Sequence, residues 1–175
     1  MQFNLEQDSL QAIASKIKLL ALDVDGVLTD GRLYFSNSGE EIKAFHSLDG
    51  HGIKMLIETG VEVGIITGRT SQIVEKRAKD LGISLLYQGR EDKLEALKEI
   101  LADKDYPLDQ VAYAGDDLPD LSAIQHVGLG FSVLNGHPDL RAAAAAVTAN
   151  RGGSGAVREI TDFIIKSQGK YELFI

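Results

Sequence analysis

The stretch KLLALDVDGVLTDG, residues 18–31, decides the fold. It is an apolar run that ends on two aspartates, Asp23 and Asp25, and then continues with Gly26. A run of this length and composition predicts a buried strand over residues 19–24. Two like charges at its end repel each other, and neither can be buried without a cost in free energy. The stretch therefore predicts a strand whose end holds carboxylates for a chemical reason.

The rest of the chain alternates between short apolar runs and longer stretches of helical spacing. Further strands are predicted over residues 61–66, 84–87, 110–115 and 127–133. Helices are predicted over residues 49–60, 70–82, 91–105 and 117–125. Nearly continuous apolar strands are typical of a parallel sheet that is covered on both faces. The alternation predicts an α/β protein with an open, doubly wound, mainly parallel sheet of the Rossmann-like type.

One segment interrupts this alternation. Residues 32–46, RLYFSNSGEEIKAFH, predict a β-hairpin around Asn37-Ser38-Gly39, which would form a flap between the first strand and the first helix. The segments that follow Asp25 and Thr67 are too short for an inserted cap domain. With 175 residues, of which 44% are hydrophobic, the chain predicts a single domain over residues 1–175.

Composition limits the partners that the chain can have. It carries 26 acidic and 18 basic side chains, a net charge of -8, and no basic run that would follow a nucleic-acid backbone. It contains no cysteine, which excludes disulfides and thiolate chemistry and fits a reducing compartment. No apolar run approaches membrane-spanning length. We therefore expect a cytoplasmic protein that acts on neither nucleic acid nor membranes.

Polar residues follow successive predicted strands. In an open α/β sheet the ligand binds at the carboxyl ends of the strands, so these residues should meet. They are Asp23 and Asp25 after the first strand, Thr67, Gly68 and Arg69 after the second, Lys93 at the next helix start, and Asp116, Asp117 and Asp120 after the fourth strand. Two carboxylates about 4 Å apart repel by about 4 kcal/mol at an effective dielectric of about 20, so the cluster needs a cation or a shared proton. All-oxygen ligands favour magnesium.

Phosphoryl transfer is the chemistry that suits this set. Asp23 would attack phosphorus as the nucleophile, and Asp25, two residues on and on the same side, would act as general acid and base. Asp23, Asp116 and the backbone carbonyl of Asp25 would hold magnesium, with Asp117 and Asp120 in support. Thr67 and Lys93 would bind the phosphate oxygens. Taken singly, each feature could be a turn, a helix cap or a solvated charge; their joint occurrence at successive strand ends favours catalysis.

The motifs also carry a resemblance. LDVDGVLT, ITGR, the lysine of GREDK, and GDDLPD together resemble the four motifs of the haloacid dehalogenase superfamily of phosphatases. The longer strings AFHSLDGHGIKML, IITGRTS, LYQG and RGGSGAVRE resemble a narrower family, the 3-deoxy-D-manno-octulosonate 8-phosphate (KDO 8-phosphate) phosphatases of lipopolysaccharide biosynthesis. The resemblance implies a small magnesium enzyme without a cap that forms a homotetramer, its hairpins meeting in a central barrel.

The narrower resemblance also implies residues at or near a sugar acid phosphate. Besides Asp25, Gly68 and Lys93, these are His46, Ser47, Leu48, Asp49, Gly50, Lys54, Arg69 and Arg77. Lys54 stands where the family often has arginine. Two readings stay open for the loop at residues 151–155, RGGSG: an anion-binding helix start or a flexible connection.

Other functions remain open as well. One is a phosphatase for a related nine-carbon sugar acid phosphate, and another is a non-catalytic scaffold subunit with the same fold. Apolar residues in the hairpin (Leu33, Phe35, Ile42, Phe45) and at the chain end (Leu173, Phe174, Ile175) predict burial between subunits. We therefore expect a homo-oligomer, a tetramer, in which a neighbour's hairpin and C-terminal tail complete the sugar pocket.

Overall fold

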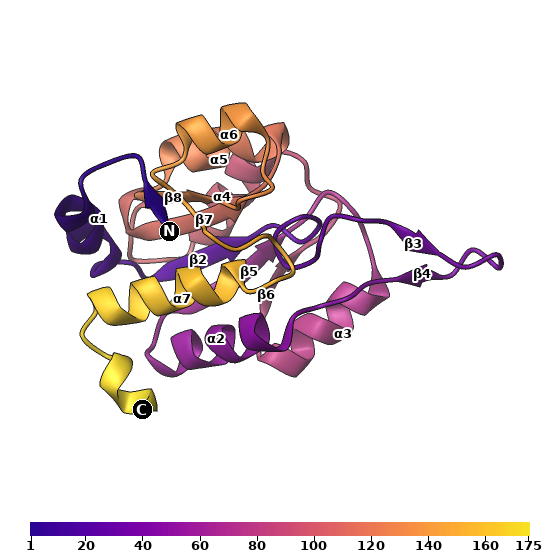
Figure 1. The fold of residues 1–175 in the computed structure, drawn as a ribbon, viewed down its shortest axis with the longest axis horizontal. Helices are drawn as coiled ribbons and strands as arrows, with labels where there is room; N and C mark the ends of the chain where they lie inside the picture. Colours follow the sequence, from indigo (N-terminus) through magenta and orange to yellow (C-terminus); the bar gives the residue numbers. More distant parts are fainter.

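A seven-stranded sheet forms the centre of the molecule (Figure 1). The computed structural model describes residues 1–175. The strand order is β1-β9-β8-β7-β2-β5-β6, and every neighbouring pair is parallel except β1 with β9. The strands are β1 (Gln2–Phe3), β2 (Leu19–Leu22), β5 (Glu62–Ile66), β6 (Leu85–Tyr87), β7 (Val111–Gly115), β8 (Leu129–Ser132) and β9 (Ala146–Val147). The predicted doubly wound, mainly parallel sheet is confirmed.

Helices cover both faces of this sheet. One face packs against α1 (Gln7–Ala14), α2 (Ser47–Glu58), α3 (Gln72–Leu81) and α7 (Ala156–Ser167). The other packs against α4 (Lys93–Leu101), α5 (Leu121–His126) and α6 (Pro138–Ala143).

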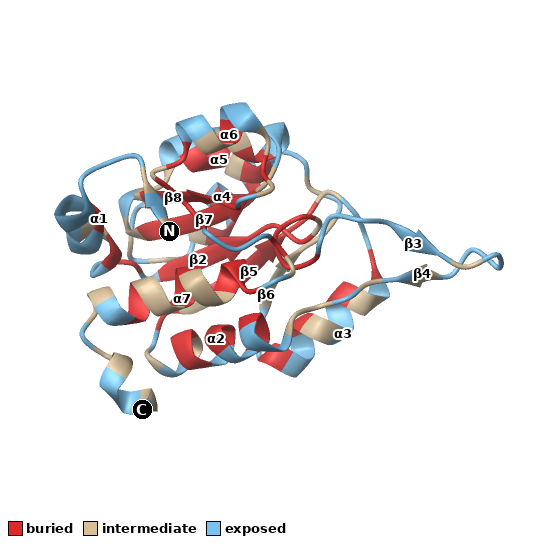
Figure 2. Cartoon of the chain, viewed as in Figure 1, coloured by how far each residue is buried: buried red, intermediate tan, exposed pale blue.

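The central strand β2 shows how the sequence fills both cores. Leu20 and Leu22 point into the first core, whereas Leu19 and Ala21 point into the second. Because successive side chains of a strand alternate between its faces, an unbroken apolar run is what a strand covered on both sides requires. Figure 2 shows the central strands buried and the outer helix faces exposed.

The order of the strands locates the site. From β2 the chain continues to β5 and β6 on one side, and then returns to β7, on the other side of β2, and continues to β8 and β9. The direction of winding therefore reverses between β2 and β7. Ligands of open α/β sheets bind at the carboxyl ends of the strands at such a reversal.

The predicted hairpin is present. Strands β3 (Tyr34–Phe35) and β4 (Glu41–Ile42) pair antiparallel, with Tyr34 opposite Ile42, and Gly39 in the turn has a φ of 85°. The hairpin projects from the body of the molecule beyond α3 (Figure 1). Between β2 and β5 the chain forms only this hairpin and α2, and between β5 and β6 only α3. The fold therefore has a flap and no cap domain.

Several boundaries differ from the sequence-based expectations. The strand predicted over 127–133 begins at Leu129, because the N–H of Gly128 donates to the carbonyl of Leu108 and not to β7. The helix predicted over 91–105 ends at Leu101. The helix predicted over 117–125 is a short 3-10 turn, η2 (Leu118–Asp120), followed by α5. The remaining 3-10 turns are η1 (Leu108–Gln110) and η3 (Tyr171–Phe174). No helix of the structure is long and apolar enough to span a membrane.

Candidate active site

A pocket of about 380 Å³ opens at the carboxyl ends of β2, β5 and β7. It is lined by Asp23, Asp25, Gly31, Leu33, Thr67, Gly68, Arg69, Glu91, Lys93, Asp116, Asp117, Pro119 and Asp120. All nine residues that the sequence placed at the strand ends are among them. A larger hollow of about 590 Å³ lies beside β1 and β9, but it contains no carboxylate. The chemistry of the lining, rather than the volume, identifies the site.

Asp23 lies at the base of this pocket and pairs with Lys93. Its backbone N–H extends the β2–β7 ladder by donating to the carbonyl of Ala114 at 3.0 Å. The ammonium group of Lys93, the first residue of α4, donates to the Asp23 carboxylate at 2.6 Å and to the carbonyl of Ile66 at 2.8 Å. Asp23 is 7% exposed and Lys93 is 3% exposed. A buried ammonium group is tolerated here because acceptors surround it.

Three carboxylates gather beside this lysine. Asp23, Asp116 and Asp120 offer ligand oxygens that all lie within 4.8 Å of one another. Burial, and then the charge of Asp120, raises the pKa of Asp23 from 3.8 to about 7, even though Lys93 lowers it. Burial, followed by the charges of Asp23 and Asp120, raises the pKa of Asp116 to about 8. A divalent cation would offset this repulsion, and oxygen donors of this kind suit magnesium.

The third member of this acidic triad (Asp23, Asp116 and Asp120) orients its neighbours. One carboxylate oxygen of Asp120 accepts from the Tyr113 hydroxyl at 2.7 Å, and the other accepts from the backbone N–H groups of Asp116 at 3.0 Å and Asp117 at 3.3 Å. Asp117 is exposed and caps η2 by accepting from the backbone N–H of Leu118 at 2.8 Å. The supporting role at the metal predicted for Asp117 and Asp120 stays a prediction.

The raised pKa values of Asp23 and Asp116 predict that magnesium stabilises the fold more at higher pH. Without metal, the carboxyl groups of Asp23 and Asp116 bind protons more tightly in the folded state than in the unfolded chain. The contribution of these two groups to the free energy of unfolding therefore falls as pH rises from about 4 to 8. Magnesium needs the ionised carboxylates, so its stabilisation grows over the same range. Thermal melting with and without magnesium should show a larger increase in Tm at pH 8.5 than at pH 6. An Asp116→Asn variant should lose most of this difference, and an equal increase at both pH values would contradict the expectation.

Close backbone packing holds the loop that carries Asp25. Gly26 has a φ of 100°, and a Cβ atom there would lie 2.0 Å from the carboxylate of Asp116, so only glycine fits. The loop at residues 151–155 packs on the same backbone: a Cβ atom at Gly152 would lie 1.7 Å from the Gly26 carbonyl oxygen. Close approach to the site loop therefore explains Gly152 and Gly153, whereas Gly155, at the start of α7, has a φ of 99° that favours glycine.

Thr67 and Gly68 form the wall of the pocket next to Lys93. Thr67 is buried, and its backbone is fixed from both sides, since its N–H donates to the carbonyl of Tyr87 and its carbonyl accepts from the N–H of Arg90, both at 2.9 Å. The Arg69 side chain is 45% exposed at the mouth. This wall presents a hydroxyl group and a cation to the pocket.

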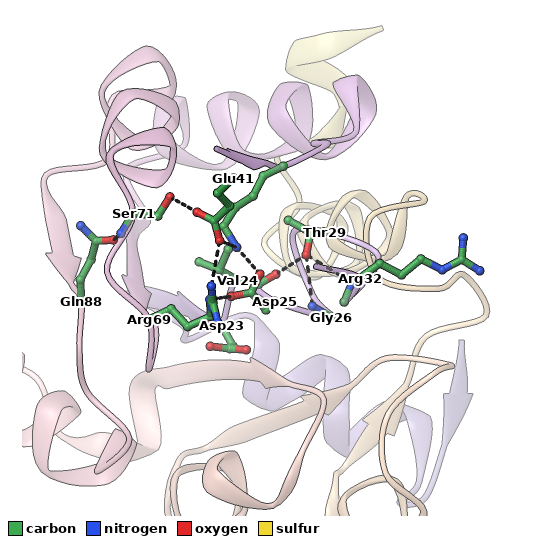
Figure 3. A network of polar contacts seen from close by, with 12 residues as sticks. Asp23, Val24, Asp25, Gly26, Thr29, Arg32, Glu41, Arg69, Ser71 and Gln88 are labelled. Atoms are coloured by element: carbon green, nitrogen blue, oxygen red, sulfur yellow. Dashed lines mark hydrogen bonds and ion pairs between the residues drawn. The ribbon is translucent and has the colours of Figure 1, made fainter. Parts of the chain in front are cut away.

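The hairpin supplies two charged residues that the sequence analysis did not select. Lys43 forms an ion pair with Asp25, and its ammonium group lies 3.4 Å from Glu41. Glu41 in turn accepts hydrogen bonds from Ser71 and Arg69 (Figure 3). The signal that could have found them is the alternation in EEIKAFH, where positions 41, 43 and 45 share one face of a strand. The pocket-lining residues Gly31, Leu33, Glu91 and Pro119 were also not predicted as site residues.

The residues implied only by the resemblance lie on α2, at the residue before it (His46) and on α3, outside the pocket lining of this chain. They are His46, Ser47, Leu48, Asp49, Gly50, Lys54 and Arg77. Their part in binding substrate stays a prediction. Leu48 and Lys54 are exposed, and a ring nitrogen of His46 is buried without a hydrogen-bond partner.

Two of these residues have structural contacts of their own. The buried carboxylate of Asp49 accepts from the backbone N–H of Arg158 at 2.8 Å and from that of Gly155 at 3.4 Å, so it caps the start of α7. The anion at this helix start is thus a side chain of the protein itself. The guanidinium of Arg77 lies over the ring of Phe45, 5.5 Å from its centre, and against Gly50.

Comparisons with known proteins identify the family of this chain. A family model described as haloacid dehalogenase-like hydrolase matches residues 86–160. The 3-deoxy-D-manno-octulosonate 8-phosphate phosphatase KdsC of Yersinia pestis is 50% identical over 159 residues, which are 91% of this chain and 85% of that protein. KdsC of Escherichia coli K12 is 47% identical over 161 residues, 92% of this chain and 86% of that protein.

Solved structures show the same fold. A probable YrbI family phosphatase from Pseudomonas syringae has a TM-score of 0.94 and 53% identity, with 95% of each chain covered. The KDO 8-phosphate phosphatase of Moraxella catarrhalis, solved with a magnesium ion, a phosphate ion and KDO, has a TM-score of 0.95 and 44% identity, with 97% of each chain covered. The chain belongs to the haloacid dehalogenase-like hydrolases and, within them, to the family of 3-deoxy-D-manno-octulosonate 8-phosphate phosphatases. The resemblance seen in the motifs is confirmed, and the chain is a phosphoric monoester hydrolase.

Proposed function

We propose that this protein is a magnesium-dependent phosphatase that hydrolyses KDO 8-phosphate to KDO and phosphate, and thereby serves lipopolysaccharide biosynthesis. The observation that carries the proposal is that the acidic triad, which includes Asp23, lies in one pocket with Asp25 and Lys93. A scaffold subunit would not need every one of these groups. The identity of the substrate is inferred from the names of the relatives given above.

The reaction would proceed in two steps. A carboxylate oxygen of Asp23 attacks phosphorus, the bond from phosphorus to the sugar oxygen breaks, and Asp25 gives its proton to the leaving alkoxide. Water then attacks the phosphorus of the aspartyl-phosphate, Asp25 takes a proton from that water, and phosphate leaves while the Asp23 carboxylate is restored. Thr67 and Lys93 hold the non-bridging oxygens during both steps.

Magnesium would be held by Asp23, Asp116 and the backbone carbonyl of Asp25. When bound, it offsets the repulsion between carboxylates and phosphate. Asp120 would act behind these ligands, because its oxygens already accept from the backbone N–H groups of Asp116 and Asp117 and from Tyr113. Arg69, exposed at the mouth, is the cation best placed to meet the carboxylate of a sugar acid.

Phosphate release from a panel of substrates tests this proposal. The panel holds KDO 8-phosphate, nine-carbon sugar acid 9-phosphates, and glucose 6-phosphate as a control without a carboxylate, each with magnesium and with a chelator. We expect the highest kcat/KM for KDO 8-phosphate and no turnover after chelation. A preference for a nine-carbon substrate would replace the substrate in the proposal, and the absence of any magnesium-dependent release would overturn it.

We also propose that residues 1–175 form one catalytic domain and that this domain assembles into a homotetramer. In the single chain, Leu33, Phe35 and Ile42 of the hairpin are about half exposed, at 49%, 58% and 58%, and Leu173 and Ile175 at the chain end are mostly exposed, at 72% and 80%. Phe45 and Phe174 instead pack on the chain's own core, so burial between subunits is not needed to explain them. A neighbour's hairpin, placed over the mouth that Leu33 lines, would shield the sugar from water.

A charge on this hairpin should break the assembly. Phe35→Glu is expected to sediment as a smaller species and to lose kcat/KM for the sugar acid phosphate, while p-nitrophenyl phosphate hydrolysis is spared, because the latter needs no sugar pocket. Leu5→Glu, at an exposed apolar residue away from the hairpin, is the matched control. A wild-type protein that sediments as a fully active monomer at assay concentration would contradict the proposal.

A further inference from the structure

Lys43 is a buried lysine whose surroundings are carboxylates. Along β4 and the residues that follow it, positions 41, 43 and 45 turn toward the body of the molecule, whereas Ile42 and Ala44 are exposed. The side chain of Lys43 is 2% exposed; its ammonium group donates to Asp25 and lies 3.4 Å from Glu41. Burying an ammonium group is unfavourable unless opposite charges compensate it. Two do so here, and one of them is the proposed proton donor.

The carboxylate of Asp25 depends on this lysine for its orientation. The hydrogen bond from Lys43 is the only one that the Asp25 carboxylate accepts, since no backbone N–H reaches it. Arg69 adds a positive charge nearby but does not orient this carboxylate. Its Nε atom lies 3.9 Å from the other oxygen of Asp25, which is too far for a hydrogen bond. Asp23, by contrast, is held by Lys93. The two aspartates are thus oriented by different lysines from different parts of the chain.

Glu41 fixes Lys43 in turn. Its carboxylate accepts from the Ser71 hydroxyl at 2.8 Å and from Arg69 at 3.1 Å (Figure 3). The Ser71 hydroxyl, as the largest influence, lowers the pKa of Glu41, which keeps it ionised. Ser71 is itself held, because its backbone N–H donates to the side chain of Gln88 at 2.8 Å. A series of contacts through Glu41 and Lys43, at the base of the hairpin, therefore links Ser71 in the β5–α3 connection to Asp25.

The charges of this cluster also balance. Lys43 and Arg69 carry two positive charges, and Asp25 and Glu41 carry two negative charges, so the formal sum is zero. This balance holds when Asp25 is ionised; when Asp25 carries the proton that it transfers, Glu41 remains the counter-charge of Lys43. A hairpin that served only as a cover would need neither residue.

We propose that Lys43 is a positioning residue for Asp25: it aims the Asp25 carboxyl at the oxygen of the leaving group, and Glu41 holds Lys43 in place. This inference rests on the proposed function, in which Asp25 transfers the proton. A sugar alkoxide is a strong base and needs that proton in order to leave, whereas p-nitrophenolate leaves without one. The contribution of Lys43 should therefore depend on the leaving group.

Lys43→Met tests this with two substrates. For KDO 8-phosphate we expect kcat to fall about 30-fold and KM to change less than about threefold, because misplaced proton transfer affects the transition state rather than binding. The rate of the first turnover of p-nitrophenyl phosphate should change less than about threefold, since that step needs no general acid. Lys43→Arg should recover part of the loss. Lys79→Met, on the exposed side of α3, is the matched control.

The same measurements can overturn the inference. A raised KM with an unchanged kcat would make Lys43 a substrate contact. Equal losses with both substrates would make it part of the phosphate site or of the fold, and no loss would leave it without a role in the reaction. If Lys43→Met does not fold, as judged by circular dichroism melting, Glu41→Gln carries the test, with a loss confined to the sugar phosphate. Equal losses with both substrates, or no loss, in Glu41→Gln would overturn it likewise.

Asp25→Asn separates this inference from the proposed function. If Asp25→Asn keeps its turnover of the sugar phosphate, the proposed role of Asp25 as general acid fails and the inference about Lys43 fails with it, whereas the phosphatase activity stands. If Asp25→Asn is inactive while Lys43→Met is normal, only the present inference fails. Because Lys43 acts through Asp25, adding Lys43→Met to Asp25→Asn should cause no further loss of kcat. A further loss of about 10-fold or more would show that Lys43 acts by another route.

Discussion

Replacing Asp23 by asparagine is expected to lower turnover by about 10⁵-fold or more, because a carboxamide of nearly the same size is a poor nucleophile. The fold should survive. The asparagine oxygen can still accept the hydrogen bond from Lys93, and the substitution removes one of three repelling carboxylates. The measurement is phosphate release by a preparation free of wild-type enzyme, together with thermal melting.

The control for this variant is an aspartate remote from the pocket. Asp139→Asn, at a side chain that is 77% exposed on α6, makes the same chemical change and should leave kcat unchanged. Near-normal rates in Asp23→Asn would mean that no aspartyl-phosphate forms at this residue. Another nucleophile in the pocket, or direct attack by water, would then have to replace it.

Replacing Asp116 by alanine should raise the magnesium concentration needed for half-maximal activity by at least about 100-fold, because a ligand at the metal is lost. We expect Asp120 to be a poor substitute, since both of its oxygens already accept hydrogen bonds, from Tyr113 and from backbone N–H groups. Saturating magnesium should restore part of kcat. Titration of activity with magnesium gives the result.

The wild-type protein provides the reference for this titration. Exhaustive chelation should abolish its activity, and added magnesium should restore it. Asp139→Ala is the matched control, because the Asp139 side chain is 77% exposed on α6 and does not line the pocket. Full activity after chelation, or an unchanged magnesium requirement in Asp116→Ala, would contradict a metal site built on this residue.

The parts of the fold that could be predicted are those that a regular pattern specifies. Five of the seven strands of the sheet are apolar runs covered on both faces, and each appears where the pattern placed it. The site follows from the same reasoning, because strand order alone brings Asp23, Thr67 and Asp116 to one edge. Strands β1 and β9 have two residues each, too few for any period to be visible, and their pairing depends on residues far apart in the chain.

The parts that could not be predicted depend on contacts between distant segments. Hydrophobicity would turn Ile42 inward and Lys43 outward, but the structure does the reverse, because the inner side of the hairpin base faces charged groups. Asp49 offers a second example. In the sequence it is one more acidic residue at a helix start. Only in the folded chain does it contact the start of α7 at Gly155, a residue 106 positions later in the sequence.

The placement of two metal-ligand candidates, Asp23 and Asp116, directly after β2 and β7 bears on how the protein folds. These strands pair in parallel, with Leu22 opposite Ala114, and the polypeptide between them must close a long loop before they meet. Parallel pairing of distant segments is a slow event in folding. A cation that joins the ends of both strands finds its site only after that event. The bound cation therefore slows the unfolding of the native sheet and leaves the folding rate of the chain unchanged.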